Sequence, residues 1–282
     1  MSGFTVADAL VEARARGVDR LDAQLLLARA LARPRAWLIA NDGVVLDATQ
    51  THEYLDELAR RASGEPLAYI VGEKEFHGLA LEVNSDVLVP RADTETLVDW
   101  ALELLRGPLA AVGAPRVVDL GTGSGAIALA VKHGAMDAQV CAVDASAAAL
   151  EVAQRNVQRF GLDVRLLCSH WWDALAGQRF DLALSNPPYV AEGDAHLADL
   201  RHEPAMALAA GVDGLDAIRQ IVAHAIEHLE IGGWLLLEHG HDQAASVSAL
   251  LARAGFSGIN SRRDLAGVLR CSGGFVPATA QG

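Results

Sequence analysis

One short segment indicates the fold: Val117-Val118-Asp119-Leu120-Gly121-Thr122-Gly123-Ser124-Gly125-Ala126. Its apolar first half, followed by glycines at alternate positions, predicts a buried strand that turns tightly into a helix. The glycines allow the tight turn and let a ligand approach the backbone, and the start of the helix presents unpaired N–H groups. The segment therefore predicts a strand, a ligand-binding loop and a helix, although a tight turn without a ligand would use the same residues.

The chain around this segment alternates apolar, strand-like runs with amphipathic, helix-like runs. We expect strands at 116–120, 140–143, 164–168, 180–185 and 233–238, and helices near 125–134, 147–160, 213–230 and 242–254. Such alternation is typical of an α/β fold with a doubly wound, mostly parallel, Rossmann-like sheet covered on both faces. Ligands of this fold bind beyond the carboxyl ends of the strands.

The first part of the chain has a different pattern and predicts further domains. Residues 1–65 consist of helix-like runs and carry no nucleotide or metal motif. In 66–90, apolar runs at 68–71 and 79–83 flank a glycine-containing turn, which predicts a β-hairpin. We therefore expect a small helical N-terminal domain over 1–65 that recognises a partner, a β-hairpin linker over 66–90, and a larger domain over 91–282 that contains the glycine-rich segment.

Composition restricts the classes of function. The 282 residues are 51 % hydrophobic and 21 % charged, as in a globular protein of two domains or one large one. Acidic residues outnumber basic ones by 36 to 23, a formal net charge of −13. Direct binding to nucleic acid needs a basic face, so we do not expect it.

The cysteines and the apolar runs bear on location. Cys141, Cys168 and Cys271 are too few and too scattered for a disulfide framework or a zinc cluster, which favours reduced thiols. The first residues do not have the pattern of a signal peptide, and we find no apolar run of about 18 residues that could span a membrane. We expect a cytoplasmic protein without membrane contact.

The glycine loop is compatible with two cofactors. Gly121, Gly123 and Ala126 satisfy the dinucleotide pattern G-x-G-x-x-G/A, and Asp144 follows the next strand, where it can accept a ribose hydroxyl. Asp119, however, would repel a pyrophosphate and attract the amino group and sulfonium of S-adenosyl-L-methionine. This carboxylate favours S-adenosyl-L-methionine, but the loop alone leaves the cofactor open.

A second motif, Asn186-Pro187-Pro188-Tyr189, follows the strand expected at 180–185. The prolines stiffen the backbone and remove N–H donors. The side-chain carbonyl of Asn186 and the backbone carbonyl of Pro187 can then accept both hydrogens of a planar –NH₂ group, and Tyr189 offers a face for stacking. A rigid turn is the alternative explanation of these residues when they are taken alone.

This arrangement answers a chemical problem. An amide or aromatic amine is a weak nucleophile because its lone pair is delocalised. Two fixed acceptors orient the group towards an electrophilic methyl carbon and stabilise the positive charge that develops on nitrogen. Together with the glycine loop and Asp144, the motif predicts methyl transfer to a planar nitrogen, with Asn186, Pro187 and Tyr189 as catalytic residues.

One weaker pattern suggests a metal. His224, Glu227 and His228 match H-x-x-E-H, which occurs in some metalloproteases. No third ligand is evident near them in the sequence, and a solvated helix face explains the same residues. We expect no metal site.

Several further segments carry a resemblance to a known family. They are 64–70 with Gly72 and 75–78, the run Val89-Pro90-Arg91-Ala92-Asp93-Thr94-Glu95, and 119–128, 154–156, 186–189, 203–204 and 236–240. Over nearly its whole length the chain resembles the peptide chain release factor glutamine N5-methyltransferases, which are class I S-adenosylmethionine-dependent methyltransferases. Ala92 stands where the family signature has proline.

The resemblance implies site residues and a cofactor. The residues that would hold S-adenosyl-L-methionine are Asp119, Gly121, Thr122, Gly123, Gly125, Asp144, Trp171 and Asn186. Trp171 would lie near the adenine; His170 precedes it where family members often have an acid. The residues that would bind the substrate glutamine or form its pocket wall are Asn186, Pro187, Pro188, Tyr189 and Arg91.

The resemblance also implies the substrate, the glutamine of the Gly-Gly-Gln loop in bacterial peptide chain release factors, and we expect a monomeric enzyme. The related ribosomal-protein glutamine methyltransferases are an alternative. DNA adenine-N6 methyltransferases share the four-residue motif but are disfavoured by the charge. A cofactor-binding module without catalysis would not need the motif, and a nicotinamide oxidoreductase leaves it unexplained.

Overall fold

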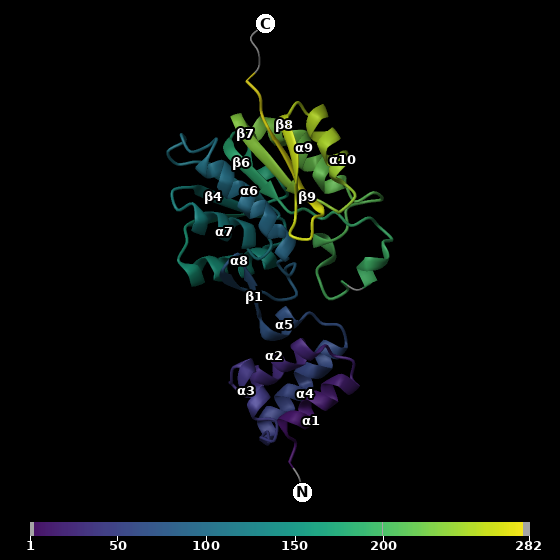
Figure 1. Cartoon of the computed structure of the whole chain (residues 1–282). Helices are drawn as coiled ribbons and strands as arrows, with labels where there is room; N and C mark the ends of the chain where they lie inside the picture. Colours follow the sequence, from purple (N-terminus) through teal and green to yellow (C-terminus); the bar gives the residue numbers. More distant parts are fainter. Residues whose placement is uncertain (1–2, 199, 279–282) are drawn as a thin grey trace. The chain divides into compact units, whose positions relative to one another are not determined.

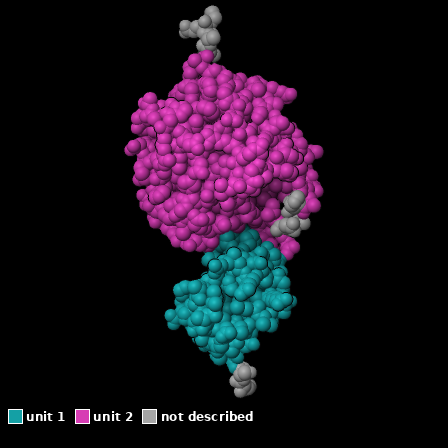
Figure 2. Space-filling view, viewed as in Figure 1, with its two compact units in different colours: residues 1–72 teal, residues 73–282 magenta. Residues whose placement is uncertain are grey.

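The computed structural model describes residues 3–198 and 200–278. They form two compact units, one ending at Gly72 and one beginning at Glu73 (Figure 2). None of the helices in these residues combines the length and apolar character needed to cross a bilayer.

The smaller unit is helical, as expected. Its helices are α1 (Val6–Ala15), α2 (Arg20–Ala30), α3 (Arg35–Ala40), α4 (Ala48–Ala62) and α5 (Leu67–Val71) (Figure 1). Thr5 and Asp47 begin α1 and α4 with capping boxes, in which side chain and backbone satisfy each other's free groups. The core contains Leu26, Leu27 and Tyr54, and the Tyr54 hydroxyl donates a hydrogen bond to the Ala9 carbonyl at 3.0 Å.

The hairpin is present, but its first strand was predicted in the wrong place. Residues 68–71 lie in α5, and the hairpin pairs β1 (Glu73–Phe76) with β2 (Leu79–Glu82) in antiparallel register. Short apolar runs do not distinguish a strand from a helical turn. The flanking residues favour a helical turn over a strand: Pro66 precedes the helix, and Gly72 ends it in the left-handed conformation with φ of 81°.

The larger unit contains a seven-stranded sheet within its described residues, in the order β5-β4-β3-β6-β7-β9-β8. Its strands are β3 (Arg116–Leu120), β4 (Gln139–Asp144), β5 (Val164–Cys168), β6 (Phe180–Ser185), β7 (Leu229–Glu238), β8 (Ser257–Arg263) and β9 (Leu269–Phe275). The strands β3 to β7 are parallel, and β9 is antiparallel to both β7 and β8. The doubly wound, mostly parallel sheet is confirmed. Its antiparallel edge was not predicted, and β7 begins at Leu229, within the helix expected at 213–230 and before the strand expected at 233–238.

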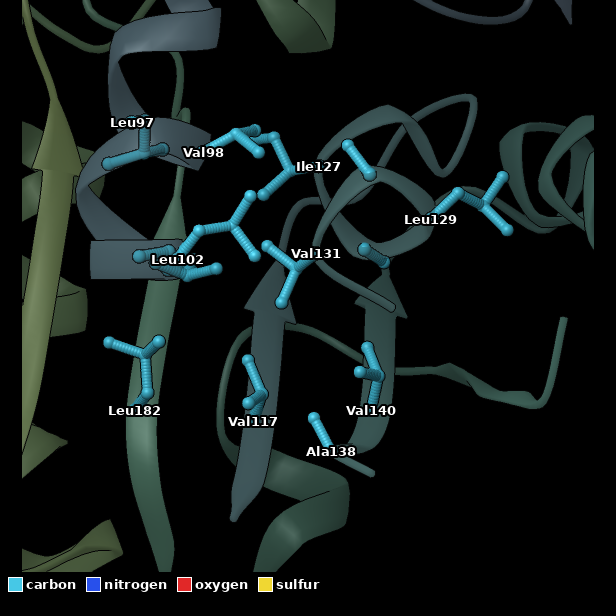
Figure 3. Close-up of a cluster of buried hydrophobic side chains, with 14 of the residues drawn as sticks. Leu97, Val98, Leu102, Val117, Ile127, Leu129, Val131, Ala138, Val140 and Leu182 are labelled. Atoms are coloured by element: carbon cyan, nitrogen blue, oxygen red, sulfur yellow. The ribbon is translucent and has the colours of Figure 1, made fainter. Parts of the chain in front are cut away.

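Helices cover both faces of this sheet (Figure 1). They are α6 (Glu95–Arg106), α7 (Ala126–Gly134), α8 (Ala147–Phe160), α9 (Asp216–His228) and α10 (Ala244–Arg253). Successive strand residues point to opposite faces, so Val117 packs in the cluster with α6 and α7 (Figure 3), whereas Val118 packs in the cluster with α9 and α10. Burial on both faces explains why these strands are almost continuously apolar.

Candidate active site

A cavity of about 210 Å³ lies where the carboxyl ends of β3, β4, β5 and β6 meet. Its lining includes Gly121, Thr122, Gly123, Asp144, Ser169, His170, Trp171, Asn186 and Pro188, together with Arg91, Thr94, Pro204 and Met206 from other segments. The position is the one expected for ligands of doubly wound sheets. The structure thus brings the two sequence motifs to one cavity.

The glycine loop needs glycine for its backbone and for its close packing. Gly121, Gly123 and Gly125 have φ of 75°, 55° and 83°, in the left-handed region. A Cβ on Gly121 would lie 3.2 Å from the Trp171 ring, and one on Gly125 would lie 3.2 Å from Leu129. Gly125 does not line the cavity; it shapes the turn into α7.

Asp119 lies beneath the loop and does not line the cavity. It is fully buried, and its Oδ2 accepts a hydrogen bond from the Thr122 hydroxyl at 2.6 Å. Its Oδ1 has no hydrogen-bond partner among the described residues. Burial raises the pKa of this carboxyl to about 7. An acceptor of this kind suits a ligand that brings a donor or a positive charge.

Asp144 lines the cavity at the end of β4. Its two carboxylate oxygens accept hydrogen bonds from the backbone N–H groups of Gly123 at 2.8 Å and Ser146 at 2.9 Å. Burial raises its pKa. Each oxygen keeps a further lone pair, so the side chain is fixed and still able to accept hydroxyl groups from a ligand.

Trp171 packs with its ring against Gly121 of the glycine loop. Its backbone has a positive φ of 43°, which is uncommon outside glycine, and its indole N–H donates to Gln220 Oε1 at 3.0 Å. The ring of His170 lies against it edge-on, with centroids 5.4 Å apart. Both side chains line the cavity, so a flat ligand group here would meet a tryptophan and a histidine.

The Asn-Pro-Pro-Tyr motif directly follows β6, but its residues are placed differently. Asn186 and Pro188 line the cavity, and the Asn186 side-chain Nδ2 donates to the Thr94 hydroxyl at 3.1 Å. Pro187 is buried, and neither it nor Tyr189 lines the cavity. The Tyr189 hydroxyl donates to Glu238 Oε1 at 3.2 Å, and burial raises the pKa of Tyr189.

Arg91 also lines the cavity, and its partner was not predicted. Its guanidinium lies 2.5 Å from Glu203 Oε1, and Glu203 Oε2 accepts from the Val89 backbone N–H at 3.1 Å. The Glu203 side chain is 3 % exposed. This carboxylate joins the segment before α6 to the segment after β6, which contributes Pro204 and Met206 to the lining.

In comparisons with known proteins, family models match residues in both units of the chain. The family model "PrmC N-terminal domain" matches residues 6–72, and the model "Methyltransferase small domain" matches residues 94–211. A "Release factor glutamine methyltransferase" of Bordetella pertussis is 49 % identical over 92 % of this chain and 96 % of its own length. The enzyme of that name from Burkholderia pseudomallei is 49 % identical over 94 % of each chain. The chain belongs to the release factor glutamine methyltransferase family.

Solved structures confirm the class I methyltransferase fold of this family member. The catalytic domain of hMettl16 in complex with a MAT2A 3′UTR hairpin aligns with a TM-score of 0.58 at 18 % identity, over 79 % of this chain and 82 % of that one. The T. thermophilus 16S rRNA N2 G1207 methyltransferase with AdoMet and guanosine aligns with a TM-score of 0.52 at 22 % identity, over 72 % and 49 %. At such low identity the likeness concerns the fold alone.

Asn156 of α8 supports the glycine loop of this methyltransferase, a role that sequence reasoning missed. It is fully buried; its Nδ2 donates to the carbonyls of Ser124 at 2.9 Å and Glu82 at 3.0 Å, and its Oδ1 accepts from the Glu82 N–H at 2.7 Å. The glycine loop is thereby bonded to the β-hairpin. The signal available in the sequence was an asparagine within a helix-like run, and this does not show which groups its side chain bonds.

Of the H-x-x-E-H residues, His228 takes part in packing, whereas His224 and Glu227 are exposed. His228 stacks on Trp172 with centroids 4.8 Å apart and an interplanar angle of 1°, and its Nδ1 lies 3.2 Å from the Gln178 carbonyl. Among residues 3–198 and 200–278, no group of three histidine, cysteine or acidic side chains is arranged to hold a metal ion.

Proposed function

We propose that this chain transfers a methyl group from S-adenosylmethionine to the side-chain amide nitrogen of the glutamine in the Gly-Gly-Gln loop of bacterial peptide chain release factors. The main observation in support of this proposal is that the glycine loop, Asp144 and Asn186 line one cavity. The names of relatives that match almost end to end support the substrate. Catalysis by Asn186, Pro187 and Tyr189 is part of this proposal.

The residues around the cavity fit S-adenosylmethionine. The unpaired Oδ1 of Asp119 and the carboxylate of Asp144 suit its cationic and hydroxyl groups, and the glycine loop admits a ligand close to the backbone. When bound, this cofactor supplies an electrophilic methyl group on sulfur. We assign its binding to Asp119, Gly121, Thr122, Gly123, Gly125, Asp144, Trp171 and Asn186, with Asp119 and Gly125 acting by shaping and charging the loop.

The substrate amide needs acceptors and an apolar wall. We assign its –NH₂ group to the Asn186 side-chain oxygen and the Pro187 carbonyl, which accept its hydrogens and stabilise charge on nitrogen. Pro188 lines the cavity next to them. Tyr189 contributes its ring, and Arg91, held by Glu203, contributes the opposite wall.

The remaining parts of the proposal concern partners and location. The helical unit up to Gly72 binds the release factor, and the enzyme acts in the cytoplasm, where release factors work. We also propose that the enzyme acts as a monomer. The net charge of −13 supports a protein substrate over direct contact with nucleic acid.

The test is a direct competition between substrates. The protein is incubated with labelled S-adenosylmethionine and, separately, a release factor, the same factor with alanine at the Gly-Gly-Gln glutamine, ribosomal proteins and duplex DNA. We expect label only on the unaltered release factor. Label on ribosomal protein or DNA, or on the alanine variant, would contradict the proposal.

Asp119→Asn tests the buried carboxylate through stability. Its folded pKa of about 7 exceeds the unfolded value of about 3.9, so from about pH 4 to about pH 7 the unfolded chain binds fewer protons and Asp119 increasingly destabilises the fold. We expect Asp119→Asn to gain urea resistance over the parent as pH rises through this window, without cofactor. It should also bind S-adenosylmethionine more weakly. The exposed Asp137→Asn is the control; a gain that does not change with pH would contradict this assignment.

A further inference from the structure

A partly buried set of hydrogen bonds lies next to Asn186, and the function proposed above does not use it. Asn186 Nδ2 donates to the Thr94 hydroxyl at 3.1 Å, and the Thr94 side chain lies against Glu238, whose pKa it lowers as a hydrogen-bond donor does. The Tyr189 hydroxyl donates to Glu238 Oε1 at 3.2 Å. Thr94 is 4 % exposed and Glu238 is 1 % exposed, whereas Asn186 and Tyr189 are half-buried.

The chemistry of these groups gives the bonds a direction. An ionised carboxylate only accepts, so the single proton of the Thr94 hydroxyl goes to Glu238. The lone pairs of that hydroxyl then face Asn186 and require a donor, which is the amide –NH₂ group. The two ends of an asparagine amide are nearly equal in size and opposite in hydrogen-bonding role. Ionised Glu238 therefore selects one of two orientations that sterics alone would not separate.

We propose, on the basis of the proposed function, that Glu238 is a positioning residue that acts through Thr94 to keep the Asn186 side-chain oxygen free for the substrate amide. In the opposite orientation Asn186 would present –NH₂ to the –NH₂ of glutamine, donor against donor. That orientation neither holds the substrate nor stabilises charge on its nitrogen. The Tyr189 bond places the other side chain of the motif on the same carboxylate.

Protonation of Glu238 removes the preference for one orientation of the Asn186 amide. A neutral carboxyl can donate to Thr94, which frees the Thr94 proton to point at Asn186 and stabilises the opposite orientation. Burial raises the pKa of Glu238 to about 7. The titratable and charged groups around it are Tyr189, Asp93, Arg270 and Cys271; the positive charge of Arg270 favours the ionised form, and the negative charge of Asp93 opposes it. We expect kcat to rise with pH through about 7.

The test compares Glu238→Gln, Thr94→Val and Thr94→Ser with the parent enzyme. Methylation of a release factor is measured from pH 6 to 9, with the cofactor dissociation constant determined in parallel. We expect Glu238→Gln and Thr94→Val to lower kcat at pH 8 about tenfold or more, with cofactor binding within about twofold of the parent. Glu238→Gln should lose the rise in kcat near pH 7. Thr94→Ser keeps the hydroxyl group that Thr94→Val removes, so its kcat should be close to that of the parent.

The matched control is Asp264→Asn, which alters another buried carboxylate that contacts Arg270 but not Thr94. It should keep the parent kcat and pH profile. A Glu238→Gln enzyme with the parent kcat and pH profile, or an inactive Thr94→Ser, overturns the inference. If Glu238→Gln does not fold, Thr94→Val decides, because it leaves the carboxylate in place. A parent enzyme that labels no release factor overturns the proposed function instead, and the inference with it.

Discussion

Asn186→Ala lowers kcat for methylation of a release factor by about 10²-fold or more and weakens binding of S-adenosylmethionine by a much smaller factor. Asn186 lines the cavity beside the glycine loop; its –NH₂ group is bonded to Thr94, and no described residue donates a hydrogen bond to its oxygen. Truncation removes one of the two acceptors proposed for the substrate amide and leaves the Asp144 contacts intact. Single-turnover methylation and calorimetric titration with the cofactor measure the two effects separately.

The control for this variant is Asn260→Ala, the same substitution at an exposed position on β8. It should methylate at the parent rate. Parent-like turnover of Asn186→Ala would refute the role of the side-chain oxygen. Loss of cofactor binding equal to the loss of turnover would show that Asn186 serves the cofactor and not the substrate amide.

Asn156→Leu destabilises the larger unit by about 3 kcal/mol and weakens cofactor binding. The substitution keeps the size of the side chain but leaves two backbone carbonyls and one N–H without the partner that Asn156 provides in the parent. Each such group costs about 1–3 kcal/mol when it stays buried, and the Ser124 carbonyl belongs to the cofactor loop. Urea denaturation with and without S-adenosylmethionine measures both consequences.

The matched control is Gln154→Leu, on the exposed side of the same helix. It should change the free energy of unfolding by no more than about 0.5 kcal/mol. If Asn156→Leu unfolds at the same urea concentration as this control, the bonds between α8, the hairpin and the glycine loop do not contribute to stability as we infer.

Features that depend on neighbouring residues could be predicted. The strands β3, β5 and β6 begin and end where their apolar runs do, and the glycine loop has the left-handed conformations that its sequence requires. Family membership could also be inferred, because its motifs are local. The misplaced strand at 68–71 shows the limit, since four apolar residues are compatible with either element until Pro66 and Gly72 are taken into account.

Features that depend on distant partners could not be predicted. Nothing in the run 89–95 indicates that Arg91 pairs with Glu203, 112 residues away, or that Thr94 receives the amide of Asn186 across 92 residues. Glu238 is part of a recognisable motif, but its hydrogen bond to Tyr189 joins the end of β7 to the segment that follows β6, and these meet only in the folded sheet. Side-chain hydrogen bonds of this kind are set by where parallel strands end, not by spacing along the chain.

The sequence by itself determined the α/β class, the helical first unit, the family and the segments that meet at the cavity, because these follow from periodicity and short motifs. Only the tertiary structure decided which end of the Asn186 amide faces Thr94, that Asp119 lies beneath the loop, and that Tyr189 is turned to Glu238. The physical reason is burial: a polar group removed from water must bond to whatever the fold places beside it. That neighbour is known only once the strands are assembled.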